Sequence, residues 1–261
     1  MLLKGKKALI MGVANKRSIA WGIATCFHRE GAELAFTYQN ERLRENVAEL
    51  VGELPGGENI PLLPCDVTSD EQVTAVFHAL AERWGELHVL VHSLAYAEKE
   101  DLNRSFVDIS RRGFGIALEI SAYSLIPIAR GAKPLMEKAG GGSIMTLTYN
   151  AVERVVPSYN VMAVAKAALE CEVRYLAAEL GPSNIRVNAI SAGPLKTLAA
   201  SAVRGLSRFR DIVEEKAPLR RNITQEEVGD VAVFLASDLS RAVTGNTIFV
   251  DSGFHIMGLV E

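Results

Sequence analysis

Near its N-terminus the chain reads Ala8-Leu9-Ile10-Met11-Gly12-Val13-Ala14-Asn15-Lys16-Arg17-Ser18-Ile19-Ala20. The four leading apolar residues predict a buried strand, Gly12 permits a tight turn, and residues 18–30 predict a helix. The free N–H groups at the start of such a helix attract a pyrophosphate. Only one glycine of the usual G-x-G-x-x-G pattern is present, so an ordinary strand-to-helix turn is the alternative interpretation.

Short apolar segments alternate with longer amphipathic ones along the rest of the chain. The further strands are expected at 34–38, 61–65, 89–92, 143–148, 186–190 and 248–250. The further helices are expected from 41, over 69–85, over about 110–138, after 148 and from about 224. Strands that alternate with helices pair in parallel and carry helices on both faces. The sequence therefore predicts an α/β fold, a single Rossmann-like doubly wound parallel sheet with residues 1–261 as one domain.

A sheet of this kind binds ligands outside the carboxyl ends of its strands. We therefore expect one crevice, lined by the segments that follow Met11, Tyr38, Cys65, His92, Thr148 and Ile190. The two least regular stretches, 95–108 and 193–210, lie at the same edge and are candidate substrate loops. We expect the stretch 193–210 to cover the substrate.

Composition narrows the classes of function. The net charge of −3 gives no electrostatic case for binding nucleic acid. The five histidines show no metal-like spacing, so we expect no metal, and no apolar run reaches the roughly 20 residues of a membrane span. Residues 1–7 do not resemble a signal peptide. The three widely spaced cysteines are typical of a reducing compartment, so we expect a cytoplasmic protein.

The ends of three expected strands carry candidate nucleotide contacts. Neutral Gln39 and Asn40 follow the second strand, where an arginine would favour a 2′-phosphate, so the sequence favours NAD. Asp66 follows the third strand and either bonds an adenine amine or caps the next helix. The small segment 93–95, with Ser93 and Leu94, either allows close approach of a cofactor or is ordinary packing.

Tyr159 and Lys166 are separated by six residues on an expected helix. Seven helical positions come to about two turns and roughly 10 Å, so both side chains lie on one face. A nearby ammonium favours the phenolate, which predicts that the pKa of Tyr159 falls below its usual value of about 10. Such a pair serves as a proton donor or an oxyanion partner. The alternative is a surface tyrosine and an unrelated lysine.

Taken together, these residues resemble the bacterial enoyl-[acyl-carrier-protein] reductases of the FabI type, a divergent branch of the short-chain dehydrogenase/reductases. The resemblance extends over nearly the whole chain and rests on the segments 12–20, 92–95, Tyr149, Tyr159-x6-Lys166 and 190–200. Most short-chain dehydrogenases use Tyr-x3-Lys, and position 163 here is Ala. The chain departs from the family at Met11, where Thr is common, and at Asn150-Ala151, where a glycine is frequent at the second position.

The resemblance implies the reduction of a trans-2-enoyl thioester by NADH in fatty acid biosynthesis. It implies that Tyr159 bonds the thioester oxygen as an enolate develops, that Lys166 holds the nicotinamide ribose, and that Tyr149 faces the substrate unless it only packs. It further implies a homotetramer, substrate contacts at Ala97 and Met162, and cofactor contacts at Gly12, Ser18, Ile19, Gln39, Asp66, Val67, Ser93, Leu94, Lys166, Leu195 and Thr197.

Two other functions are open. Ketone reductases of the same superfamily usually carry a serine about thirteen residues before the tyrosine, where this chain has Thr146, and their lysine lies three residues closer. A dinucleotide sensor without catalytic activity needs none of Tyr149, Tyr159 and Lys166. The combination of these residues therefore favours the enoyl reductase.

The stretch after Ala200 carries three arginines, Arg204, Arg208 and Arg210, with Leu206 and Phe209 between them. Acyl carrier proteins are strongly acidic, and positive charge at the mouth of the crevice would steer such a partner. The sequence therefore predicts a basic dock at these arginines. A solvated helix face with ordinary arginines is the alternative.

Overall fold

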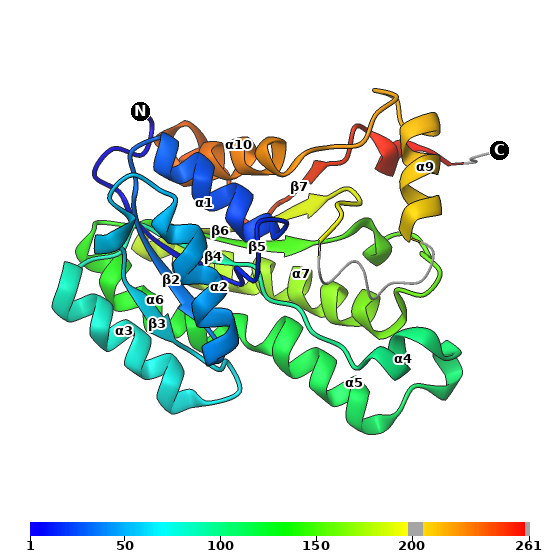
Figure 1. The fold of residues 1–261 in the computed structure, drawn as a ribbon, viewed down its shortest axis with the longest axis horizontal. Coiled ribbons are helices and arrows are strands. Elements are labelled where there is room, and N and C mark those ends of the chain that lie inside the picture. Colours follow the sequence, from blue (N-terminus) through cyan, green and yellow to red (C-terminus); the bar gives the residue numbers. More distant parts are fainter. Residues whose placement is uncertain (198–205, 259–261) are drawn as a thin grey trace.

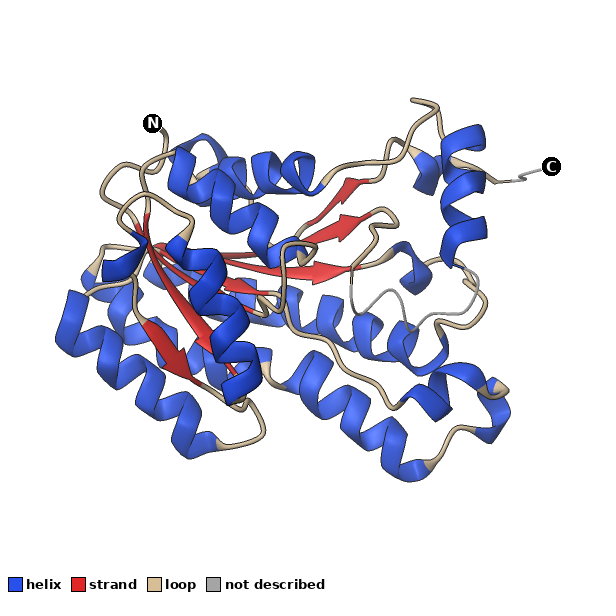
Figure 2. Cartoon of the chain, viewed as in Figure 1, coloured by secondary structure: helices blue, strands red, loops and turns tan. Residues whose placement is uncertain are grey.

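The computed structural model describes residues 1–197 and 206–258 (Figure 1). One parallel sheet of seven strands runs through the centre (Figure 2), in the order β3-β2-β1-β4-β5-β6-β7. The strands are β1 (Lys7–Met11), β2 (Glu33–Tyr38), β3 (Leu62–Pro64), β4 (Val89–His92), β5 (Gly142–Thr148), β6 (Ile185–Ala192) and β7 (Thr247–Val250). The strand order reverses between β1 and β4, which is where such sheets bind dinucleotides.

Helices cover both faces of the sheet, so the predicted doubly wound α/β class is confirmed. One face carries α1 (Ile19–Arg29), α2 (Glu41–Gly52) and α10 (Gln225–Ala236). The other carries α3 (Asp70–Trp84), α6 (Leu125–Lys138) and α7 (Asn160–Leu180). Neighbouring residues of β1 point to opposite faces, with Leu9 in one apolar core and Ile10 in the other, because side chains alternate along a strand.

Local side-chain chemistry fixes several helix ends. The N–H of Leu43 donates to the Asn40 side chain at the start of α2, and the N–H of Gln72 donates to Ser69 at the start of α3. Gly85 ends α3 in the left-handed conformation with φ 72°. These caps fix where α2 and α3 begin and end relative to the strand ends before and after them.

The predicted helix over 110–138 is wrong in one respect. It divides into α5 (Arg111–Leu118), a π-helical turn (Glu119–Tyr123) and α6. The Ser124 hydroxyl donates to the carbonyl of Ile120 at 2.7 Å, and the Ser121 hydroxyl bonds the backbone of Tyr96. The Ser124 hydroxyl thus takes the carbonyl four residues back, while the Ser124 N–H donates to the carbonyl of Glu119, five residues back, at 3.1 Å. Such π-turns often occur at functional sites.

The two stretches predicted to be irregular contain helical segments. The first holds α4 (Lys99–Asn103) and a 3₁₀ turn (Phe106–Asp108), held because Asp101 accepts from the N–H and hydroxyl of Ser110 at 2.9 Å each. The second ends in α9 (Leu206–Lys216), so residues 206–210 are helical rather than loop.

Two absences concern only the part of the chain that the structure describes. No helix there has both the length and the apolar character that crossing a bilayer requires. Nor do three or more His, Cys, Asp or Glu side chains gather there in a way that would hold a metal ion.

Candidate active site

The turn after β1 packs tightly against the segment that follows β4. Gly12 has φ 97°, and a β-carbon at this position would clash with the carbonyl oxygen of Ser93 after β4. The Ser18 hydroxyl accepts from the N–H groups of Ala14 at 3.0 Å and Asn15 at 3.1 Å. Ser18 therefore organises the turn itself, which the sequence did not predict.

Helix α1 starts at Ile19, and Ser18 stands at its N-cap position without a side-chain capping bond. The first N–H groups of the helix are therefore not satisfied by the residue that would usually cap them. An α-helix with an uncapped start attracts an anion such as a pyrophosphate. The tight turn at Gly12 and the uncapped start of α1 together fit the binding of a dinucleotide.

Gln39 and Asp66 meet across the ends of β2 and β3. The Gln39 side-chain amide donates to Asp66 Oδ2 at 3.1 Å, and Asp66 Oδ1 accepts from the N–H and hydroxyl of Thr68. Burial works to raise the pKa of Asp66, but the hydrogen bonds from Thr68 and Gln39 outweigh it and leave this pKa below its usual value. Ser69 caps α3, which removes the alternative role proposed for Asp66.

Lys166 ties α7 to the ends of two strands. The side chain is 4% exposed, and its Nζ donates to the carbonyl of Leu147 at 2.7 Å and towards that of Leu94 at 3.5 Å. Burial lowers the pKa of Lys166 to about 8, while the carboxylate of Glu170 acts to raise it. Since burial favours loss of the proton, the acidic neighbour matters for the charge of this group.

Tyr149 and Tyr159 face one another across the site. Their ring centroids are 4.9 Å apart at an interplanar angle of 53°. Tyr149 directly follows β5, and Tyr159 is the residue before α7 rather than part of that helix. The structure brings the two tyrosines together, and Tyr159 lies at the boundary of α7 rather than within the helix as expected.

The predicted fall in the pKa of Tyr159 is wrong for this structure. Each tyrosine keeps part of its surface exposed, and burial of the phenol raises the pKa of both. For Tyr149, the neighbouring Tyr159 and Asp251 add to the rise. The Lys166 ammonium donates to backbone carbonyls, and its charge does not overcome burial of the Tyr159 phenol. Both phenols therefore stay protonated near neutral pH.

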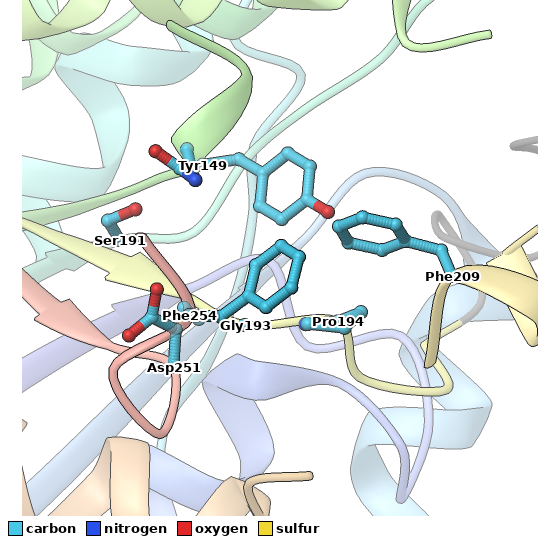
Figure 3. A pocket seen from close by; sticks show the side chains of 9 residues that line it. Tyr149, Ser191, Gly193, Pro194, Phe209, Asp251 and Phe254 are labelled. Carbon is cyan, nitrogen blue, oxygen red and sulfur yellow. The ribbon is translucent and has the colours of Figure 1, made fainter. Parts of the chain in front are cut away.

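A small pocket opens beside Tyr149 (Figure 3). The rings of Tyr149 and Phe209 are 6.4 Å apart, and those of Phe209 and Phe254 are 5.5 Å apart, both edge to face. Phe209 belongs to α9 and Phe254 follows β7, so these contacts pack α9 and the segment after β7 against Tyr149. The pocket is further lined by Asn150, Ser191, Ala192, Gly193, Pro194 and Asp251.

The comparisons with known proteins agree with this geometry. A family model described as enoyl-(acyl carrier protein) reductase matches residues 12–255. The chain belongs to the enoyl-(acyl carrier protein) reductase family. It is 56% identical to the enoyl-[acyl-carrier-protein] reductase [NADH] FabI of Bacillus cereus, covering 98% of this chain and 99% of that protein. The FabI of Synechocystis is 54% identical over 98% of this chain and 99% of its own length.

Solved structures of this reductase family superpose closely on the chain. The Bacillus cereus reductase with NADP⁺ and an indole naphthyridinone has a TM-score of 0.96 at 56% identity, covering 99% of both chains. The reductase of Anaplasma phagocytophilum in complex with NAD has a TM-score of 0.94 at 46% identity, covering 100% of this chain and 98% of the other. The resemblance inferred from the sequence is therefore confirmed.

The reductase brings its two expected substrate positions together through Ser121. The Ser121 hydroxyl accepts from the N–H of Tyr96 at 2.9 Å, bonds the Tyr96 carbonyl at 3.0 Å and lies 3.8 Å from Met162 Sδ. Met162 is buried, and Ala97 directly follows Tyr96 and is half-buried. The π-helical turn thus positions the segment that carries Ala97 next to Met162.

The remaining expected contact residues lie in the described part of the chain, except for Arg204. Leu195 is buried, and its carbonyl accepts from the N–H of Thr197 at 2.9 Å. Val67 is half-buried beside the core on the α3 face. Arg208 is exposed on α9 and Arg210 is half-buried, whereas Arg204 lies outside the described residues.

Sequence reasoning missed two residues that the reductase places in this pocket, Asp251 and Phe254. Both follow β7, whose carboxyl end lies at the same edge of the sheet as the other strand ends. The rule used for the first six strands would have found them, had it been applied to the seventh. Sequence reasoning also missed the hydrogen bond that the Thr148 hydroxyl donates to Glu170.

Proposed function

We propose that this chain reduces the trans-2 double bond of enoyl-acyl-carrier-protein thioesters with NADH, in the elongation cycle of fatty acid biosynthesis. Family membership and full-length relatives named as NADH-dependent enoyl reductases support this reaction. The observation that carries the site assignment is the pair of tyrosine rings 4.9 Å apart. The buried Lys166 is held by carbonyls of Leu94, which follows β4, and Leu147 on β5.

The cofactor residues are those that surround the switch point of the sheet. When bound, NADH supplies a hydride for the β-carbon of the enoyl thioester. Gly12 lets the β1 turn pack tightly against the Ser93 carbonyl, the start of α1 favours a pyrophosphate, and Gln39 with Asp66 offers partners to the adenosine half. The proposed set is completed by Ser18, Ile19, Val67, Ser93, Leu94, Lys166, Leu195 and Thr197.

Tyr159 and Tyr149 act on the substrate in this proposal. The thioester oxygen gains negative charge during reduction, and a hydrogen-bond donor is most useful where charge develops. Tyr159 donates to that oxygen, and Tyr149 faces the substrate across the ring contact. The raised pKa of each phenol keeps its proton in place near neutral pH, which supports a role as donor. Lys166 binds the ribose hydroxyls through its ammonium group.

The acyl chain and its carrier occupy the open end of the crevice. Ala97 and Met162 supply apolar contacts, and residues 193–210 cover the substrate within a single reductase domain. The contact of Phe209 with Tyr149 supports this, since it places α9 beside the reacting residues. An acidic acyl carrier protein docks at Arg204, Arg208 and Arg210, which the exposure of Arg208 supports.

Two further properties follow from the family. We propose a homotetramer, tested by light scattering coupled to size-exclusion chromatography. We also propose a cytoplasmic location, and all three cysteines are free, as expected in a reducing compartment. The corresponding check is that the purified protein keeps its activity when no oxidant is added.

The direct test compares two substrates. NADH oxidation is followed by absorbance with a crotonyl thioester and separately with an acetoacetyl thioester. We expect turnover with the crotonyl substrate and little with the acetoacetyl substrate, because Thr146, at the position of the ketone reductases' serine, is fully buried and bonds His92 at 2.9 Å. The opposite preference would make the chain a ketone reductase.

A further inference from the structure

Helix α7 holds the end of β5 by two side-chain bonds one helical turn apart. Lys166 Nζ donates to the carbonyl of Leu147 at 2.7 Å. The Thr148 hydroxyl donates to Glu170 Oε1, also at 2.7 Å. Lys166 and Glu170 are four positions apart and therefore share a face of α7. Leu147 and Thr148 are the last two residues of β5, and Tyr149 is the next residue.

We propose that Glu170 is a positioning residue of the reductase, which fixes Tyr149 through Thr148 and holds the ammonium form of Lys166 through its negative charge. The inference rests on the function proposed above for Tyr149 and Lys166. Glu170 itself does not contact the reacting atoms. It acts on Tyr149 through the hydrogen bond with Thr148, and on Lys166 through its charge.

The bond to Thr148 is the first of the two effects. Tyr149 directly follows Thr148, so the placement of its ring against Tyr159 depends on where β5 ends relative to α7. Tyr159 is the residue directly before α7, so the bond between Thr148 and Glu170 sets the Tyr149 ring relative to the start of the helix that follows Tyr159. Small displacements of catalytic groups are costly to the rate.

The charge of Glu170 is the second effect. Burial lowers the pKa of Lys166 to about 8, and Glu170 is the acidic group that opposes this. His92 on β4 also faces Lys166, but burial lowers the pKa of His92 to about 3, so it is neutral. Burial raises the pKa of Glu170 above its usual value, although the hydrogen bond from Thr148 lowers it. Of the charges near Glu170, Glu153 after β5 also raises this pKa, whereas Arg174 and Lys166 on α7 lower it. Removing the Glu170 charge therefore lets Lys166 lose its proton at a lower pH.

Two substitutions separate these effects. Glu170→Gln keeps an oxygen that accepts from Thr148 but removes the charge. Thr148→Val removes the hydroxyl but keeps the charge, and Thr148→Ser restores a hydroxyl. Glu172→Gln is the matched control, since Glu172 is also half-buried on α7 and the carboxyl oxygen Oε2 has no hydrogen-bond partner. Thermal unfolding of each variant shows that it is folded.

The first readout is NADH affinity without substrate, measured by fluorescence titration from pH 6 to 10. Protonated Lys166 binds the cofactor, so affinity is retained below its pKa and lost as the pH rises through it. In Glu170→Gln we expect the midpoint of this loss to move down by about one pH unit, because removal of a neighbouring opposite charge shifts a pKa on that scale. Thr148→Val and Glu172→Gln should leave the midpoint in place.

The second readout is kcat with a crotonyl thioester at pH 6.5 for the Thr148 variants, which keep the Glu170 charge and therefore the ammonium form of Lys166. We expect Thr148→Val to lose about tenfold in kcat and Thr148→Ser to recover most of it. An unmoved or raised midpoint in Glu170→Gln, or equal shifts in Glu170→Gln and Glu172→Gln, would overturn the charge role. Normal kcat in Thr148→Val would overturn the positioning of Tyr149 through Thr148. A wild-type chain inactive on crotonyl thioesters refutes the proposed function instead, while the affinity midpoints still test Glu170.

Discussion

The nucleotide half and the reaction half of the strand edge are built in different ways. Around β1, β2 and β3 the site is made of backbone: a glycine with φ 97°, an uncapped helix start and a turn held by Ser18. Around β5, α7 and α9 it is made of side chains whose pKa values are shifted by burial. Binding in the first half depends on the conformation of the backbone. Chemistry in the second half depends on side chains that are buried from water.

This difference explains why the two halves respond differently to substitution. A backbone cradle is disrupted by adding atoms, whereas a side-chain site is disrupted by removing a donor or a charge. Lys166 lies between the halves, since its Nζ contacts the carbonyls of Leu94, which follows β4 beside β1, and of Leu147 on β5. It is therefore the residue at which the halves should be hardest to separate.

The largest effect is expected from Tyr159→Phe, compared with Lys166→Ala. Phe keeps the ring contact with Tyr149 but removes the donor, and loss of one such donor costs on the order of 10²–10³ in kcat. NADH affinity should stay near the wild-type value. Lys166→Ala should lower turnover and also weaken NADH binding by about tenfold or more, as expected for a charge-assisted contact.

Fluorescence titration with NADH separates the two variants. Normal NADH binding by Lys166→Ala would refute the cofactor role of this residue. Equal weakening in both variants would show that the two halves are not distinct.

The next effect is expected from Gly12→Ala. A β-carbon at position 12 meets the Ser93 carbonyl, and φ 97° is strained for alanine. The strain should weaken NADH binding by about 10- to 100-fold, the range that corresponds to 1–3 kcal/mol. Gly115→Ala on α5 is the control, because a β-carbon there meets nothing within 4 Å. If Gly12→Ala bound NADH with wild-type affinity, the role of the backbone turn at Gly12 in cofactor binding would be refuted.

A smaller effect distinguishes the two nicotinamide cofactors. Positions 39 and 40 are neutral, and the nearby Arg44 is paired with Glu41 at 3.1 Å. A 2′-phosphate placed there loses water without gaining a bidentate partner, so we expect kcat/KM about tenfold higher for NADH than for NADPH. Gln39→Arg should narrow the gap. Steady-state kinetics that favour NADPH in the wild type would refute the assignment.

The smallest effect concerns the carrier protein. Replacing Arg204 and Arg208 by Glu should raise KM for an enoyl-carrier-protein substrate by roughly three- to tenfold, because steering of an acidic partner is lost. The rise should shrink at high salt through screening. The matching enoyl coenzyme A lacks the extended protein surface and should change less. If KM changed equally for both substrates, the carrier-protein dock would be refuted and these arginines would belong to an ordinary solvated helix face.

The sequence predicted the backbone half better than the side-chain half. The turn at Gly12 and the positions of the strands along the chain were visible because turns and periodicity are local properties. The direction of the Tyr159 pKa shift was predicted wrongly, because the neighbours that bury a phenol come from distant segments. The π-helical turn was missed for the same reason, since it depends on contacts such as that of Ser121 with Tyr96. Spacing alone placed Lys166 near Tyr159 but could not reveal Glu170 and Thr148.

The most direct measurement is a competition between two substrates for labelled cofactor. The chain is given equal amounts of crotonyl and acetoacetyl thioesters with NADH carrying deuterium at the transferable position, and the products are analysed by mass spectrometry and NMR. The account predicts a butyryl thioester with the deuterium on its β-carbon and unreacted acetoacetyl thioester. A labelled 3-hydroxybutyryl thioester with unreacted crotonyl thioester would contradict it.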